Sequence, residues 1–150
     1  MQGQISIKTK LGWISAFEKE GKIFKIKFGK LRKQHSKKIL KNFRNKLNSF
    51  LKKKTLIIKI PHIIEGNRIQ KKIWNELKKI KYGKTKSYID VGKKYKLSPR
   101  YIGKICGQNK LLLVVPCHRV IRNDGNLGGF SSTGGTKLKK KILDFEKENL

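Results

Sequence analysis

The sequence predicts an α+β fold in two parts, a strand-rich first half and a helical second half. In the first half, apolar and polar residues alternate in short runs separated by glycines, as in antiparallel strands. In the second half, Ser, Asn and Pro precede apolar residues at helical spacing, which is typical of capped helices. A chain of 150 residues is long enough for two small domains. We place the boundary after residue 62, which gives domains of 1–62 and 63–150.

Strands account for most of the first half. Alternation over residues 5–7, 13–17 and 23–28 predicts three short antiparallel strands with a glycine at each turn. The β-branched run 55–60 predicts a further strand, which Pro61 ends.

One helix, over residues 36–53, is expected in the first half. Its apolar residues recur at helical spacing and predict a face that packs into a core. They are Ile39, Leu40, Phe43, Leu47, Phe50 and Leu51. The histidines of this half, His35 and His62, have no cysteine beside them, so we expect no metal site.

The second half is divided by helix start and stop signals. Asn67 caps a first helix, Ser87 opens a short one, and Ser98 opens another that Gly107 ends. The spacing of the last two fits a helix-turn-helix, although many helical pairs share it without touching DNA. A final helix begins near Thr136.

The charge of the chain restricts its partners. There are 39 Lys+Arg against 9 Asp+Glu, a formal net charge of +30. Such self-repulsion favours a polyanionic partner, with nucleic acid first and an anionic membrane surface second. A solvated lysine surface, as in thermophiles, also remains open. Neither a membrane-spanning run nor a signal peptide is visible, so we expect a cytoplasmic protein with reduced thiols.

The strongest candidate for catalysis is the run 114–121, in which Pro116 is followed by Cys117, His118 and Arg119. Only a thiolate is a useful nucleophile, and an adjacent imidazole and cation favour it. The alternative is that Cys117 is a small buried hydrophobic residue. A glycine-rich loop follows at 127–135, either approaching a ligand closely or acting as a flexible connection.

Five segments together resemble a known family in their order and spacing. They are 82–88, 100–103, Asn109, 116–120 and 128–131. The resemblance is to the O6-alkylguanine-DNA alkyltransferases, also called methylated-DNA–protein-cysteine methyltransferases. It is close over about residues 67–148 and extends to the first half only in layout.

The resemblance implies a ribonuclease-H-like α/β domain followed by a winged-helix-like helical domain that carries the helix-turn-helix. It also implies direct DNA repair. The O6-alkyl group of a guanine flipped out of double-stranded DNA would move irreversibly to the cysteine, with O4-alkylthymine as a second substrate. The reaction would be a single turnover by a monomer, without a cofactor.

Residue roles follow from the resemblance by position. Cys117 corresponds to the alkyl acceptor, His118 to the base that deprotonates it through a water, Glu146 to the carboxylate that orients the histidine, and Asn109 to the residue that holds the turn. The expected substrate-binding residues are Tyr88, Val120, Phe130 and Ser131. The expected DNA-binding residues are Arg100, which would fill the vacated stack, together with Tyr101, Gly103 and Arg119.

Two other classes of function remain alternatives. One is a DNA-binding protein without catalysis, such as a winged-helix regulator or an alkyltransferase-like protein, against which Cys117 argues. The other is a thiol-redox or metal protein, for which no C-x-x-C supplies support. The family pattern is also altered at Phe130, where some members have tyrosine, and the loop from there to Glu146 is longer than in some relatives.

Overall fold

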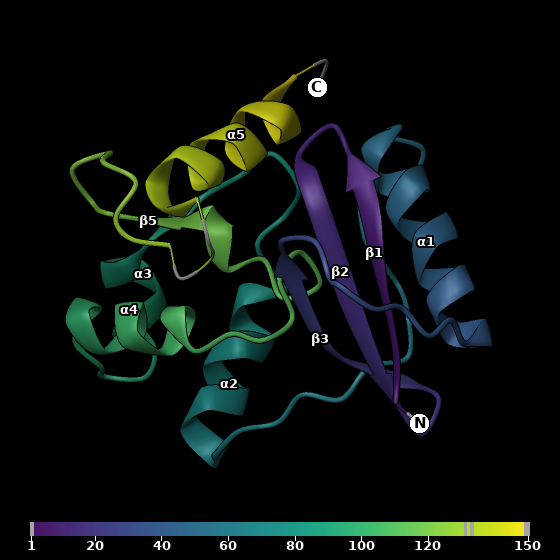
Figure 1. Ribbon diagram of the computed structural model, residues 1–150. Helices are drawn as coiled ribbons and strands as arrows, with labels where there is room; N and C mark the ends of the chain where they lie inside the picture. Colours follow the sequence, from purple (N-terminus) through teal and green to yellow (C-terminus); the bar gives the residue numbers. More distant parts are fainter. Residues whose placement is uncertain (1, 131, 133, 149–150) are drawn as a thin grey trace. The chain divides into compact units, whose positions relative to one another are not determined.

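The computed structural model describes residues 2–130, 132 and 134–148, and it divides the chain into two compact units (Figure 1). The first unit comprises residues 1–65 and 110–114, and the second comprises 66–109 and 115–150. The first contains an antiparallel sheet with one long helix, and the second is mainly helical. The predicted α+β organisation is therefore confirmed.

A three-stranded antiparallel sheet forms the framework of the first unit. Its strands are β1 (Gly3–Thr9), β2 (Gly12–Lys19) and β3 (Lys22–Phe28), in that spatial order. Gly12 and Gly21 have φ values of 116° and 77° at the turns, a conformation that side chains disfavour. The three predicted strands are confirmed, each somewhat longer than its alternating core.

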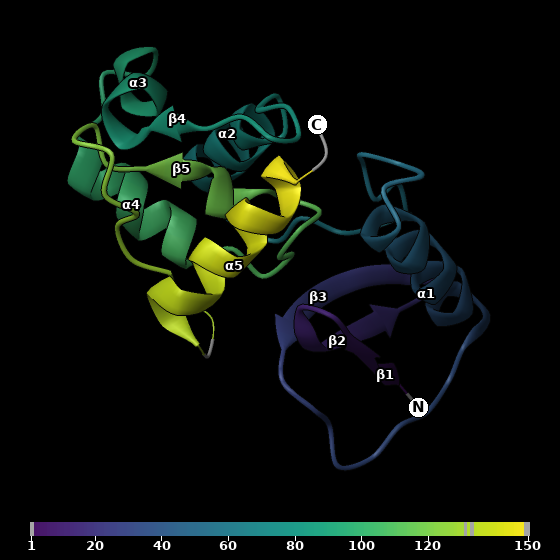
Figure 2. The same ribbon diagram turned by 90° about the horizontal axis from the view of Figure 1, so that it is seen from above.

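Helix α1 (Lys38–Leu51) lies against one face of this sheet in both views (Figures 1 and 2). Its buried side chains meet the apolar face of the sheet, as the helical spacing predicted. The core formed in this way includes Ile5, Ile14, Ile23, Ile26, Leu40, Phe43, Leu47 and Phe50.

The prediction of a strand at residues 55–60 is wrong. Ile58 and Ile60 are buried, but Ile57 is 74% exposed, and the segment pairs with no strand in the part of the chain that the structure describes. Pairing occurs only beyond Pro61, at an isolated bridge between Ile23 and His62. The β-branched residues here are used for burial at alternate positions, without a ladder.

Within the described residues, the second unit contains four α-helices: α2 (Arg68–Leu77), α3 (Tyr88–Lys93), α4 (Pro99–Gly107) and α5 (Gly135–Lys147). The predicted caps are confirmed, since Asn67, Ser87 and Ser98 each accept a backbone N–H three residues later. Helices α3 and α4 pack together as the expected pair. Among the described residues, no helix is both long and apolar enough for a membrane crossing.

Two short parallel strands of the second unit were not predicted. Strand β4 (Lys86–Ser87) pairs with β5 (Val120–Ile121), beside the 3₁₀ turn Cys117–Arg119 (Figure 2). This pairing joins the start of α3 to the residues that follow Cys117.

A second unpredicted feature is the excursion at residues 110–114. These residues belong to the first unit, where the Lys110 carbonyl accepts a hydrogen bond from the Ile26 N–H at 2.8 Å. The chain then returns to the second unit at Val115, just before Cys117.

Candidate functional site

A pocket of about 420 Å³ in the second unit contains the predicted nucleophile. Helix α3, helix α4, the Cys117 turn and the glycine-rich loop all contribute to its wall. The lining residues are Tyr88, Pro99, Gly103, Cys106, Gly107, Cys117, Arg122, Gly128, Gly129 and Phe130. Four predicted site residues are thus brought together: Cys117, Tyr88, Gly103 and Phe130.

Cys117 is buried at the start of its 3₁₀ turn, with 3% of its surface exposed. The Asn109 amide donates to Cys117 Sγ at 3.2 Å and to the Val115 carbonyl at 2.9 Å. Burial raises the pKa of the Cys117 thiol, while the Asn109 hydrogen bond and the charge of Lys139 oppose that rise. Asn109 therefore both fixes the backbone before the cysteine and provides a donor to a developing thiolate.

His118 and Glu146 form a fully buried pair. His118 Nε2 lies 2.9 Å from Glu146 Oε2, and among the described residues His118 Nδ1 has no hydrogen-bond partner. Burial lowers the pKa of His118, although Glu146 opposes this. The neutral ring then carries its proton on Nε2, toward the carboxylate, so Nδ1 keeps a lone pair that can accept a proton.

Arg119 completes this cluster, and the structure does not favour its expected contact with DNA. Its Nε and Nη2 atoms donate to the two oxygens of Glu146 at 2.9 and 2.7 Å, and Nη1 donates to the Ile80 carbonyl at 2.8 Å. Only 6% of the residue is exposed. A buried carboxylate without a cation would be strongly destabilising, and a bidentate arginine compensates its charge. This accounts for the buried position of Arg119.

The buried charge of Glu146 predicts that the fold loses stability in acid. Burial alone would raise its pKa, but hydrogen bonds from His118 and Arg119 outweigh this effect and lower the pKa to about 2. A carboxyl whose folded pKa is depressed stabilises the fold above its unfolded pKa. That stabilisation disappears as pH falls through the folded pKa.

We therefore expect Glu146 to contribute about 3 kcal/mol to the free energy of unfolding at pH 5 and progressively less toward pH 2. Urea unfolding at intervals of half a pH unit measures this loss. In Glu146→Gln the pH dependence should be flatter by that amount, although the variant is less stable throughout. An identical pH slope in both proteins would contradict the assignment.

Lys139 is a site residue that the sequence analysis missed. It is fully buried on α5, and its Nζ donates to Tyr88 Oη at 3.1 Å, to the Gly129 carbonyl at 3.1 Å and to the Leu127 carbonyl. A buried ammonium with three acceptors is well satisfied. The signal was present in the sequence, because Lys139 and Glu146 stand two helical turns apart on the buried face of α5.

Tyr88 lies between Lys139 and the glycine-rich loop. Gly128 has a φ of 74°, and a Cβ there would lie 2.9 Å from the Tyr88 ring, so only glycine fits. Burial raises the pKa of Tyr88 to about 12, which keeps its hydroxyl protonated. Because Tyr88 Oη accepts from Lys139, its own hydrogen is available to a ligand in the pocket.

The predicted DNA-binding residues of α4 lie at its N-terminal end. Arg100 is exposed and Tyr101 is 38% exposed, whereas Gly103 lies on the pocket side, 3.8 Å from the Tyr88 ring at its Cβ position. At Gly92, a Cβ would lie 2.3 Å from the Leu97 carbonyl, so glycine permits the tight turn between α3 and α4.

Of the expected substrate-binding residues, Tyr88 and Phe130 line the pocket. Val120 is buried in β5 and is not among the lining residues, and Ser131 lies outside the described residues. Conversely, the pocket is lined by Cys106 and Arg122, which the sequence did not indicate as substrate-binding residues.

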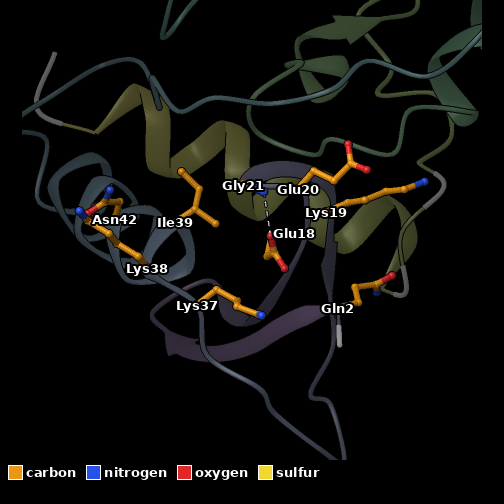
Figure 3. A pocket seen from close by; sticks show the side chains of 9 residues that line it. All are labelled: Gln2, Glu18, Lys19, Glu20, Gly21, Lys37, Lys38, Ile39 and Asn42. Atoms are coloured by element: carbon orange, nitrogen blue, oxygen red, sulfur yellow. Dashed lines mark hydrogen bonds between the residues drawn. The ribbon is translucent and has the colours of Figure 1, made fainter.

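A larger hollow, of about 800 Å³, lies in the first unit near the turn between β2 and β3 (Figure 3). Its one buried charged residue is Glu18, whose carboxylate accepts the N–H groups of Gly3 and Gly21 at 2.8 and 3.1 Å. These hydrogen bonds lower the pKa of Glu18, so the carboxylate closes the turn and is a poor general base.

The sequence and the fold both have known counterparts. Residues 68–148 match the family described as 6-O-methylguanine DNA methyltransferase, DNA binding domain. A methylated-DNA–protein-cysteine methyltransferase of Sulfolobus acidocaldarius is 42% identical over 84 residues, 56% of this chain and 52% of that protein. A protein of the same name from Metallosphaera sedula is 36% identical over 99 residues, 66% of this chain and 62% of that protein. The matched part thus spans less than two thirds of these relatives.

Solved structures extend the likeness to the whole chain. The crystal structure of the Mycobacterium tuberculosis O6-methylguanine methyltransferase has a TM-score of 0.83 at 22% identity, and the match covers 100% of this chain and 95% of that one. An O6-methylguanine DNA methyltransferase from Methanococcus jannaschii has a TM-score of 0.68 at 27% identity, covering 97% and 95%. The first of these likenesses establishes the fold alone.

Proposed function

Because the chain belongs to the 6-O-methylguanine DNA methyltransferase family, we propose that it repairs DNA by moving the alkyl group of O6-alkylguanine irreversibly to Cys117. O4-alkylthymine is the second substrate in this proposal. The observation that carries it is the contact of Cys117 Sγ with Asn109, next in sequence to a neutral His118 with an open Nδ1. A nucleophile, its stabilising donor and a base are thereby supplied within one short stretch of chain.

The chemistry requires few steps. The thiol proton of Cys117 passes through a water to His118 Nδ1, and Glu146 stabilises the resulting imidazolium. The thiolate then attacks the alkyl carbon. The bond from that carbon to O6 breaks, and its electrons remain on the base. The base then takes up one proton, the net equivalent of the proton that Cys117 gave to His118, and guanine is restored. A thioether has no good leaving group, so each molecule reacts once.

Tyr88 and Lys139 serve the base in this scheme. The Tyr88 hydroxyl hydrogen, which Lys139 leaves free, donates to an acceptor on the purine ring. Lys139 acts as a positioning residue, because its ammonium ties Tyr88 to the carbonyls of the loop that closes the pocket. Phe130 supplies an apolar wall.

Double-stranded DNA is the proposed partner, bound at α4 with the target nucleotide rotated out of the stack. A thiol that is 3% exposed inside a pocket cannot reach a base within a duplex, so flipping is required. The net charge of +30 supports a phosphate-dominated, salt-sensitive association.

A labelled-methyl assay tests the function. With a duplex that carries O6-[³H-methyl]guanine, label should move to the protein, stop at about one equivalent and map to Cys117 by peptide mass. Turnover far beyond one equivalent, or tight binding of the lesion without any transfer, would contradict the proposal. The second outcome would instead indicate a DNA-binding protein without catalysis.

Arg100 provides a test of the flipping step. If its side chain fills the gap left by the rotated nucleotide, Arg100→Ala should slow repair of a base-paired lesion by about tenfold or more, since unstacking costs a few kcal/mol. Reaction with the free base O6-methylguanine should be unchanged, because no stack is then opened. Single-turnover rates on both substrates make the comparison, and equal losses on the two would rule out this role.

A further inference from the structure

The outer face of the sheet in the first unit carries an aromatic and basic cluster that the proposed repair reaction does not use. The strand register pairs Phe17 with Lys25 and Ser15 with Lys27, so these side chains project from the face opposite the apolar core. A bulge at Phe17–Glu18 leaves Phe24 as an extra residue on β3. Its ring centroid lies 6.2 Å from that of Phe17.

Two ammonium groups converge on this aromatic pair. Lys25 Nζ and Lys27 Nζ each lie 5.6 Å from the centroid of the Phe17 ring. The ion pairs that the described residues form include neither lysine. In addition, the sequence contains no Asp or Glu from residue 21 to residue 64. The cluster therefore consists of half-buried rings with cations that nearby carboxylates do not neutralise.

We propose that this cluster, formed by Phe17, Phe24, Lys25 and Lys27, binds single-stranded DNA. Every nucleobase has a face that can stack on an aromatic ring, and lysines bind the phosphates that link successive bases. A sheet that presents aromatic residues between basic ones is a common platform for single strands. A duplex fits less well, because its bases are already stacked on each other and cannot reach a ring.

Stacking would replace contacts that are now made by the lysines themselves. A base that lies on the Phe17 ring displaces the two ammonium groups, which then turn to the phosphates on either side. The ring exchanges the two ammonium groups for a base, and each ammonium group exchanges the ring for a phosphate. If the lysines only covered the ring, neither exchange would be expected. Binding should therefore depend on the aromatic ring as well as on charge.

Trp13 provides a reporter for this face. It is half-buried on the same side of β2, four residues or about 13 Å from Phe17, with Lys30 Nζ 4.9 Å from its ring centroid. The other tryptophan, Trp74, is buried in the second unit. In a Trp74→Phe chain, titration with oligo(dT) should quench Trp13, and salt should reverse the quenching. No quenching under low salt would overturn the proposal.

Matched variants distinguish binding by this cluster from binding by the net charge of the protein. The measurement is the fluorescence anisotropy of labelled oligo(dT), titrated with the whole chain. Lys25→Gln/Lys27→Gln and Phe17→Leu should each weaken binding about fivefold or more, since stacking and phosphate contacts are each of that size. Lys52→Gln/Lys54→Gln loses the same charge from exposed positions off the face, and should change binding less than twofold. Equal losses in the two double variants, or an unaffected Phe17→Leu, would overturn the proposal.

Two further arms define the partner. Oligo(U) should bind more weakly than oligo(dT), and tighter binding of oligo(U) would overturn the assignment to DNA. The variants should transfer methyl from free O6-methylguanine at the wild-type rate, because that reaction involves no strand. The binding experiments use unmodified DNA, so their results do not depend on whether the protein has the proposed repair activity.

Discussion

Replacing Cys117 with alanine is expected to abolish alkyl transfer completely, whereas replacing Cys106 should leave it nearly intact. Both cysteines are buried and both line the same pocket. The Asn109 amide lies 3.2 Å from Cys117 Sγ, and His118 is next to Cys117 in the chain. Burial raises the pKa of both thiols, that of Cys106 to about 12, and at Cys117 the Asn109 hydrogen bond opposes the rise and favours the thiolate.

The measurement is the amount of labelled methyl bound per protein at completion, from a methylated duplex. We expect none for Cys117→Ala and about one equivalent for Cys106→Ala and the wild type. Labelling of Cys106 in the Cys117→Ala chain would show that the pocket, and not the Asn109 and His118 environment, decides which thiol reacts.

Replacing His118 with alanine should slow transfer by about 10²- to 10⁴-fold, the usual contribution of a general base. His118 is 1% exposed, so DNA affinity should remain nearly unchanged. Single-turnover transfer and equilibrium binding to the same duplex separate the two effects.

Glu146→Gln serves as the graded control. It should slow transfer less than His118→Ala, because the amide still accepts from Nε2 but stabilises the imidazolium poorly. Thermal unfolding must accompany both variants, since a neutral amide in place of the Glu146 carboxylate would leave the Arg119 charge buried without its partner. A His118→Ala protein that transfers normally, or that loses binding and transfer in equal proportion, would contradict the proton relay.

Local signals in the sequence predicted most of the secondary structure. Asn67, Ser87 and Ser98 cap helices because a short polar side chain can accept a nearby N–H, an interaction that needs no distant partner. The strand predicted at 55–60 failed for the converse reason. A strand requires a neighbouring strand, and among the described residues this run pairs with none; its first bridge lies beyond Pro61, at His62.

Interactions at long range limited the prediction of the site. Arg119 was expected to bind DNA because the family resemblance implied that role by position. Its buried pairing with Glu146 spans 27 residues and is invisible in a linear pattern. Lys139 was missed because its helical spacing from Glu146 was not used, and its three acceptors lie on other segments of the chain. The roles of the individual site residues stay predictions until the variants are measured.

The excursion at 110–114 restricts how this protein can be divided. A fragment that begins at residue 66 would retain the pocket but would also carry Leu111, Leu112 and Leu113, which are buried in the whole chain. Without β3, the Lys110 carbonyl would lose the Ile26 N–H. The family match at 68–148 therefore includes a piece of the other unit. To produce the second unit alone, the loop between Asn109 and Val115 must be shortened. A simple truncation would expose these leucines and favour aggregation.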